Sequence, residues 1–348
     1  MIAFSIGLPS PFSDWCDIVS ARIAGRASGP IETITARTLQ DIALAAIRTR
    51  SSNLLVRSCE LSARVAASIA DAESRFVLAL DDPRAALHHL VTCRGMSFAD
   101  AVRAVACSCA ATVSFAGLSG GLKLSPLDVC TNPHETVAAI GDYFGRCLST
   151  EDIVEITRDL DGFQISDDSI AKDEWWASLD EHSREIANGA LNDYRAYFSG
   201  REIGSFLWER DLFFMDEPPA SGRVQVLRPV DITGRPRCLI FGPHLTLPPG
   251  SWSALISLSL SPEAMEMTYV LEAFAGSRLA SSRIEPVSQR LIEVELRFSV
   301  DNLLEQPIEI RVWSERAAFD GQLALGHVRV TATEPIRATT RDVLETPV

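Results

Sequence analysis

The chain has 348 residues, long enough for two domains, and its 47% hydrophobic and 22% charged residues are typical of a folded globular protein. Its net charge of −14 argues against nucleic acid or an anionic membrane as the main partner. Residues 1–5 lack the features of a secretory signal and no apolar run reaches the roughly 18–20 residues of a membrane span, so we expect a cytoplasmic protein without such a span.

Short apolar strands alternate with amphipathic helices up to about residue 165, which predicts an α/β fold with a parallel sheet flanked by helices. Asn132 and Pro133 are typical of a helix start, as the N-cap and the first helical residue. The expected strands are residues 2–6, 53–56, 75–80 and 122–124. The expected helices are residues 38–48, 61–70, 98–115, 133–145 and 175–198.

The pattern changes after about residue 215, where prolines cluster and the hydrophobic period falls toward two. Residues 253–260, 291–298 and 308–313 alternate apolar and polar side chains. Short alternating strands separated by turn residues predict an antiparallel β-sandwich, which we take to be jelly-roll-like. We therefore divide the chain into an α/β domain, residues 1–210, and a β-sandwich domain, residues 211–348.

The eight cysteines lie mostly inside apolar patterns, which favours reduced, buried thiols over disulfides. Cys107 and Cys109 do not have a zinc-binding spacing, and no matching histidine or cysteine pair follows them. His88 and His89 share a predicted helix, where we interpret them as partly exposed rather than as metal ligands. No metal site is expected.

The first strand, a turn rich in glycine, proline and serine, and the following helix have the outline of a phosphate-binding loop. Gly7, Ser10 and Ser13 could supply backbone donors and hydroxyl groups to a phosphate. Phe12 stands where a glycine would let the backbone approach a phosphate, and Asp14 places a negative charge at the helix start. The residues alone leave two interpretations open, a phosphate site or an ordinary capped turn.

The same turn resembles the glycine-x-proline-arginine-serine-glycine-threonine-threonine-tryptophan loop of bacterial sulfotransferases. Gly7, Pro9 and Trp15 match that loop, and Ser13 is a conservative replacement. Ser10 stands where the family has its basic residue.

Residues 76–84 resemble the family's strand ending in arginine-aspartate-proline-arginine, which precedes the helix that binds the 3′-phosphate of the sulfate donor. The matching residues are Asp82, Pro83 and Arg84. Asp81 stands at the family's phosphate-binding arginine, and His89 stands at its partner serine. A carboxylate at this position reverses the sign of the charge that a phosphate would meet.

Residues 56–59 correspond to the family's lysine-threonine-histidine strand end, which places Cys59 at the position of the general base. With no clear acid partner, Cys59 is interpreted as a buried thiol rather than a nucleophile. Arg57 and Arg84 could still bind an anion, or could be ordinary surface or ion-paired arginines. A later segment, residues 122–145, is also similar to the family, through Asp128, Pro133, Phe144 and Gly145.

The resemblance covers about residues 1–200 and implies a P-loop sulfotransferase-like fold, whose donor is 3′-phosphoadenosine 5′-phosphosulfate. The implied cofactor-binding residues are Gly7, Pro9, Ser10, Ser13, Arg57 and Arg84. Because the donor loop, the 3′-phosphate pair and the base are all altered, we favour a non-catalytic binding or assembly protein. The alternative is an active sulfotransferase that acts on a carbohydrate hydroxyl, with Arg57 or Arg84 as its cation.

Residues 240–252, with glycine-proline-histidine followed by leucine-proline-proline-glycine, resemble a strand of sandwich domains attached to bacterial glycosyltransferases and other surface-polysaccharide proteins. This resemblance covers about residues 222–332 and implies a role in polysaccharide synthesis, with a glycan or a protein as partner. The proline-rich turns could instead form an oligomer surface. Trp252 and Trp313 could stack on a sugar or pack in the core.

Overall fold

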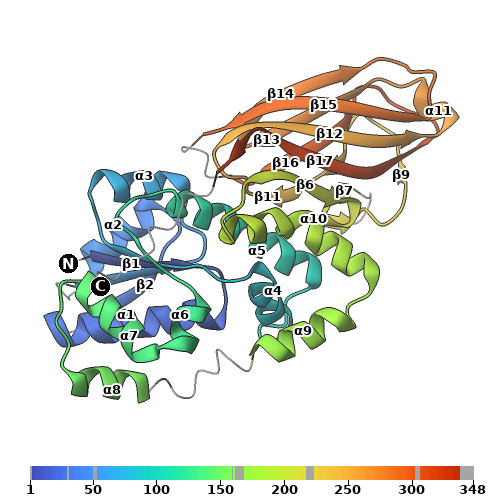
Figure 1. Ribbon diagram of the computed structural model, residues 1–348. Helices are drawn as coiled ribbons and strands as arrows, with labels where there is room; N and C mark the ends of the chain where they lie inside the picture. Colours follow the sequence, from blue (N-terminus) through green and yellow to red (C-terminus); the bar gives the residue numbers. More distant parts are fainter. Residues whose placement is uncertain are drawn as a thin grey trace.

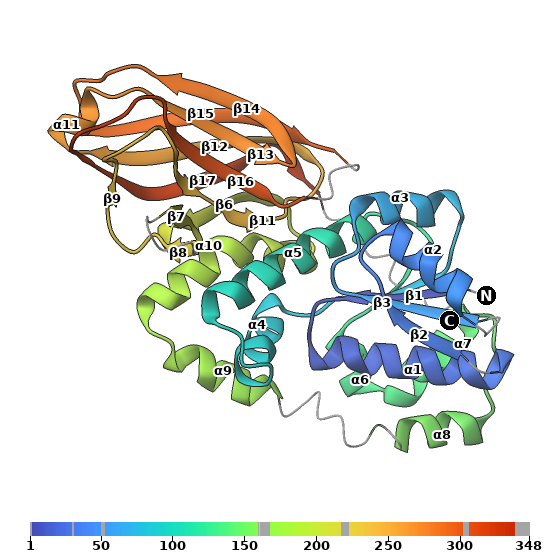
Figure 2. The same cartoon turned by 180° about the vertical axis from the view of Figure 1, so that it is seen from behind.

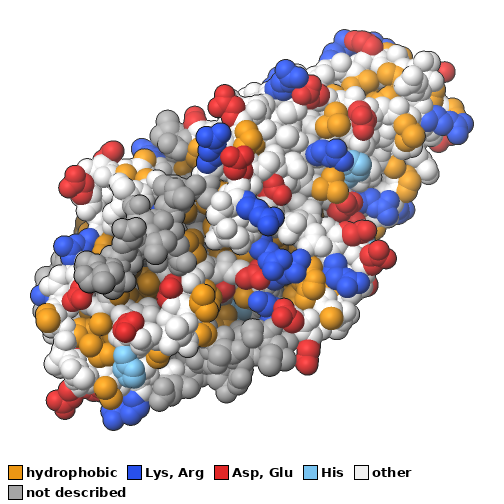
Figure 3. Space-filling model, viewed as in Figure 1, with side chains coloured by type: hydrophobic (Ala, Val, Ile, Leu, Met, Phe, Trp, Pro, Cys, Tyr) orange, Lys and Arg blue, Asp and Glu red, His pale blue; other side chains and the backbone are white. Residues whose placement is uncertain are grey.

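The computed structural model is elongated, with a parallel sheet and its helices at one end and antiparallel sheets at the other (Figure 1). The face seen in Figure 3 carries basic and acidic side chains side by side rather than one large patch of a single sign. The structure describes residues 2–29, 31–49, 53–158, 160, 168–216, 223–301 and 306–337.

The parallel sheet has the strand order β2-β3-β1-β4-β5, and all of its pairings are parallel, as the sequence predicts. The connection from β3 to β4 passes across β1. The connections that follow β1 and β4 therefore lead toward opposite edges of the sheet. Ligands of open α/β sheets commonly bind outside the carboxyl ends of strands at such a switch point. The strands are β1 (Ile2–Gly7), β2 (Ile31–Thr35), β3 (Asn53–Ser58), β4 (Phe76–Ala79) and β5 (Leu122–Leu124).

Both faces of this sheet are buried, because successive strand residues point to opposite sides. Leu55, Val77 and Ala79 pack in one core cluster with α1 (Pro11–Ser28), α6 (Pro126–Thr131), α7 (Pro133–Tyr143) and α8 (Thr150–Arg158). Val56 and Leu78 belong to the opposite core cluster. Its helices are α2 (Leu39–Arg48), α3 (Ala63–Asp71), α4 (Pro83–Thr92), α5 (Phe98–Ala116) and α10 (Glu181–Phe198).

The single helix predicted over residues 175–198 is wrong in its extent, because the structure has two helices there. The first is α9 (Asp168–Ser178), and the second is α10. Asp180 ends the continuity, since its carboxylate accepts a hydrogen bond of 2.7 Å from the backbone N–H of Ser183 and caps α10.

Helix α5 is long and apolar enough to cross a membrane by length and composition, but 72% of its most apolar window is buried inside the protein. Such burial is what a central core helix requires. The eight cysteines, two of which lie on this helix, are all free thiols.

The C-terminal half contains antiparallel sheets that share one hydrophobic core, as predicted. Strand β12 shows the expected alternation, with Trp252, Ala254 and Ile256 buried and the intervening residues more exposed. One sheet has the order β14-β13-β16-β10-β7-β8, with β11 beside β16, and the other has the order β15-β12-β17-β6, with β9 beside β17.

The strands of these sheets are β6 (Ile203–Glu209), β7 (Phe214–Asp216), β8 (Arg223–Gln225), β9 (Val230–Asp231), β10 (Cys238–Phe241), β11 (Pro243–Leu245), β12 (Gly250–Leu260), β13 (Tyr269–Ala275), β14 (Ser277–Ile284), β15 (Leu291–Val300), β16 (Ile308–Ser314) and β17 (Gln322–Ile336). A 3₁₀ turn, Arg210–Leu212, follows β6, and the short helix α11 (Pro262–Met265) follows β12. The domain boundary at residues 210 and 211 stays a prediction; β6, just before it, is hydrogen-bonded to β17.

Two helices of the N-terminal half, α5 and α10, pack against the antiparallel sheets (Figure 2). Helix α10 lies against β6 so closely that a Cβ on Gly189 would stand 2.3 Å from the carbonyl oxygen of Leu207. Helix α5 lies against β11 through Arg103, whose Nε donates to the Pro243 carbonyl at 3.1 Å and whose terminal nitrogen donates to the Leu212 carbonyl at 2.8 Å. The two halves are therefore joined by backbone contacts as well as by apolar packing.

We expect Arg103→Met to lower the free energy of unfolding by about 3 kcal/mol, because two buried carbonyl groups lose their donor. Chemical denaturation of the full chain measures this change. Arg64→Met on the exposed side of α3 is the matched control and should change stability by less than about 0.5 kcal/mol. Equal effects of the two substitutions would show that Arg103 does not hold the halves together.

Candidate functional site

The turn after β1 is packed with its own side chains. A Cβ on Gly7 would lie 2.3 Å from Ser13 Oγ and 2.9 Å from Ala79 Cβ, so only glycine fits there. Ser10 is the N-cap of α1, and its hydroxyl accepts a hydrogen bond of 3.3 Å from the Ser13 N–H. Phe12 is 2% exposed and packs in the core beneath the turn. This geometry is that of a closed, capped turn.

Two carboxyl groups, those of Asp17 and Asp81, lie at this switch point, and the nearby Lys172 pairs with Asp82 at 3.5 Å. Asp81 follows β4 and accepts a hydrogen bond from the Ser10 side chain; burial raises the pKa of Asp81 to about 6. Burial also raises the pKa of Asp17 on α1 to about 7, although its hydrogen bond with Ser5 favours the charged form. A phosphate dianion placed here would meet carboxyl groups, so the residues present do not fit the phosphates of the sulfate donor.

The two arginines expected to bind an anion do not converge on the turn. Arg57 lies on the exposed end of β3, and its Nε donates to the Thr35 hydroxyl at 3.3 Å. Arg84 lies on α4 and turns toward α10, where it donates to the Asn188 side chain at 3.0 Å. The Arg84 guanidinium also stands 4.0 Å from the centre of the Trp176 ring, an arrangement typical of a cation–π contact.

The remaining predicted positions are placed as follows. Pro9 is half-buried in the turn. Burial, together with the negative charge of Asp17, raises the pKa of Cys59 to about 12, so its thiol stays protonated near neutral pH. A protonated thiol is neither a general base nor an effective nucleophile.

The two predicted sugar-binding tryptophans differ in burial, and only Trp252 is shown to lack the free ring face that stacking requires. Trp252 is fully buried, and its indole N–H donates to the Pro248 carbonyl at 3.1 Å. Trp313 is half-buried, and its indole N–H donates to the Glu272 carboxylate at 3.1 Å. Trp252 packs in the core, the second of the two roles considered for it.

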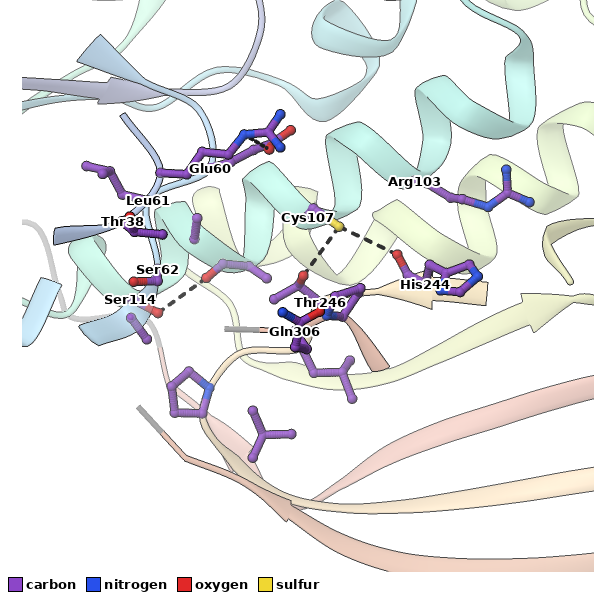
Figure 4. Close-up of a pocket in the computed structure, with 18 of the residues that line it drawn as sticks. Thr38, Glu60, Leu61, Ser62, Arg103, Cys107, Ser114, His244, Thr246 and Gln306 are labelled. Carbon is purple, nitrogen blue, oxygen red and sulfur yellow. Dashed lines mark hydrogen bonds and ion pairs between the residues drawn. The ribbon is translucent and has the colours of Figure 1, made fainter. Parts of the chain in front are cut away.

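A cleft of about 370 Å³ lies at the same edge of the parallel sheet, but beyond β2 and β3 rather than at β1 (Figure 4). Its walls come from the residues that follow β2 and β3, the start of α3, the inner side of α5, the segment from β11 to β12, and the ends of β15 and β16. The cleft is therefore formed by both halves of the molecule.

His244 shapes the sandwich side of this cleft. Its backbone has φ of 62°, in the left-handed region that non-glycine residues rarely adopt. The ring is held in place because its Nδ1 lies 3.4 Å from the Glu309 carboxylate and because Phe214 packs 5.6 Å from it, centre to centre. Near His244, a side-chain hydrogen bond links the two halves, because the Thr246 hydroxyl donates to Cys107 Sγ on α5 at 3.3 Å.

Sequence reasoning did not identify the cleft as a site, although it singled out the segment that supplies His244, Thr246 and Pro249. Arg37 and Glu60 at the rim form an ion pair of 2.9 Å and were not recognised. Nothing in the linear pattern brings them to Thr246, because the contacts across the cleft depend on how the two halves dock. Among the described residues, no group of three histidine, cysteine or acidic side chains could hold a metal ion.

No protein-family model and no curated protein matches this chain. Among solved structures, it is similar to a mouse sulfotransferase, SULT7A1, complexed with PAP, at 10% identity and a TM-score of 0.32 over 45% of this chain; the match spans 62% of that protein. It is also similar to the K1 cleaved adhesin domain of Lys-gingipain from Porphyromonas gingivalis, at 10% identity and a TM-score of 0.25 over 37% of this chain and 99% of that domain. These scores carry no functional argument, and the fold class rests on the strand order and pairing described above.

We expect stability to fall as the pH rises from about 4 to 7, because the pKa of Asp17 is raised to about 7 in the folded state, so the unfolded chain releases this proton at a lower pH than the folded chain does. Asp17→Asn cannot lose a proton there. The wild-type chain should therefore lose on the order of 2 kcal/mol more unfolding free energy than Asp17→Asn between pH 5 and pH 8, at about 1.4 kcal/mol per pKa unit. Urea denaturation at several pH values measures it, and parallel pH profiles would contradict the prediction.

Alkylation by iodoacetamide should modify Cys59 far more slowly than the exposed Cys130, because the Cys59 pKa of about 12 leaves less than about 1% thiolate at pH 8. Peptide mass spectrometry on the folded protein gives both rates in one sample. Unfolding in urea should remove the difference. Fast modification of Cys59 in the native protein would identify a reactive thiol at the general-base position.

Proposed function

We propose that this protein is a non-catalytic, cytoplasmic binding or assembly protein that acts in bacterial glycan or surface-polysaccharide synthesis. The observation that carries the non-catalytic part is the buried contact between Ser10 and Asp81 at the switch point. A sulfotransferase-like sheet would hold its donor at that place. Here the space is taken by a hydroxyl–carboxyl contact, and the charge has the wrong sign for a phosphate.

The chemistry of sulfuryl transfer supports the same proposal. The transfer from 3′-phosphoadenosine 5′-phosphosulfate to a hydroxyl group needs cations at the donor's phosphates and a base for the acceptor. Asp81 and Cys59 replace an arginine and a histidine at the positions that the resemblance assigns to these tasks. Each lost contact of this kind costs about 10²–10³ in rate, so the combined loss leaves little catalysis.

The alternative of an active sulfotransferase requires Arg57 or Arg84 to reach the donor. Arg84 is engaged with Trp176 and Asn188 on the side facing α10, and its pKa is lowered by burial and by the nearby charge of Arg195. The antiparallel sheets are the part that we propose to meet a partner, which is a glycan or another protein. Oligomer formation through their turns is a further proposal.

Isothermal titration calorimetry of the full chain with 3′-phosphoadenosine 5′-phosphate should give no heat of binding at about 1 mM nucleotide. The free energy of binding is then weaker than about −4 kcal/mol. The reason is the carboxylate-lined, closed turn. Binding at about 1 μM would overturn the proposal. In that case Arg57→Ala and Arg84→Ala would be titrated in parallel, and the variant that loses binding identifies the cation of an active site.

A further inference from the structure

The cleft between the two halves has the size and position of a small-molecule site. Its volume of about 370 Å³ lies near the lower end of the range of roughly 300–1,000 Å³ for such sites, which limits an occupant to one or two rings. It also lies between two structural units, where ligand sites are common. A molecule bound here would contact the end of β3, helix α5 and the segment before β12 at once.

The formal charges around the cleft cancel. Its charged lining consists of two arginines, Arg37 and Arg103, and two acidic residues, Glu60 and Asp301, beside His244. Arg37 and Glu60 pair with each other at the rim, with 2.9 Å between Nε and the carboxylate. The Arg103 guanidinium donates to carbonyl groups of the antiparallel half and points away from Thr38 and Ser62 in Figure 4. A strongly charged ligand would therefore find no net opposite charge.

Hydroxyl groups from separate elements line the interior. Ser62 and Thr38 come from the starts of α3 and α2, Ser114 from α5, and Thr246 from the segment after β11 (Figure 4). Ser62 Oγ is shielded from solvent and has no hydrogen-bond partner within the described residues. Ser62 lines the cleft, so rotation of its side chain about χ1 would bring this hydroxyl to a bound ligand, which would supply the missing partner. The Thr246 hydroxyl donates to Cys107 Sγ and keeps its oxygen lone pairs as acceptors.

Apolar groups complete the lining between these hydroxyls. Leu61, Leu247 and Pro249 present only carbon atoms, and alanines of α5 form the floor. A surface that alternates hydroxyl groups with small aliphatic patches matches a ligand with hydroxyl groups around a ring and C–H groups on its faces. Amines, carboxylates and phosphates would meet no net opposite charge here.

We infer that this cleft binds a neutral saccharide of one or two rings, held by hydroxyl groups of both halves of the chain. This inference rests on the proposed glycan-related function and gives that function its ligand class and its site. It places recognition between the halves and not on the tryptophans of the antiparallel sheets. Because the saccharide would contact both halves only in the folded state, it stabilises the folded chain.

The test uses the full chain on an array of neutral mono- and disaccharides together with sulfated and uronic-acid-containing ones. The neutral saccharide with the strongest signal is then titrated into wild type, Thr246→Val and Ser62→Ala by calorimetry. Thr331→Val, on the exposed face of β17, is the matched control for the first variant. Thermal unfolding without ligand confirms that each variant is folded.

We expect a neutral saccharide to bind, and each cleft variant to weaken it about 3–10-fold, the usual effect of one lost hydrogen bond, with Thr331→Val unchanged. Binding of a neutral saccharide that neither cleft variant weakens would overturn the cleft as the site while leaving the glycan-related function standing. Signals from acidic saccharides alone would overturn the ligand class. Silence across the array would overturn both this inference and glycan binding, whereas the nucleotide titration separately reports on the donor turn.

Discussion

The contact between Arg103 and the antiparallel half is the interaction on which the rest of the arrangement depends. A guanidinium with a side chain only 10% exposed is costly to bury unless its N–H groups are used. Here Asp100 on the same helix supplies the counter-charge at 2.8 Å, and the carbonyls of Leu212 and Pro243 each accept one further N–H. The Arg103 guanidinium also lies 4.5 Å from the centre of the Phe214 ring. One side chain on α5 thus fixes two turns of the antiparallel half.

The position of those turns decides where open space remains. Pro243 leads directly into His244 and Thr246, so the Arg103 contact sets the far wall of the cleft relative to α5. The other wall follows from the parallel sheet, since Glu60 and Ser62 come just after β3. The turn after β1 is closed by Gly7, Ser10 and Phe12, whereas the neighbouring space is kept open by docking two halves that are each well packed. This is why the available volume lies beside the switch point and not in it.

Local patterns predicted the parallel sheet, the antiparallel sheets and most helix starts, because strand burial and N-caps depend on residues that are close together in the sequence. Asn132 caps its helix as the sequence indicates. The break between α9 and α10 was missed because Asp180 sits inside a continuous apolar period, and only its capping geometry reveals the stop. The direction of Arg84 could not be predicted either, since it depends on Trp176 and Asn188 arriving from distant helices.

The acidic switch point has an energetic consequence for function. Asp81 is buried and Asp17 is half-buried, and both have raised pKa values, which means that the fold tolerates these carboxyl groups best when they hold their protons. A site built to bind phosphate would instead lower the energy of an anion and would be destabilised without one. The protein satisfies Asp81 internally, through the Ser10 side chain and the backbone N–H of Asp82 at 2.7 Å, so this carboxyl group needs no ligand. We place recognition instead in the cleft, because it offers open volume and because its hydroxyl groups come from both halves of the chain.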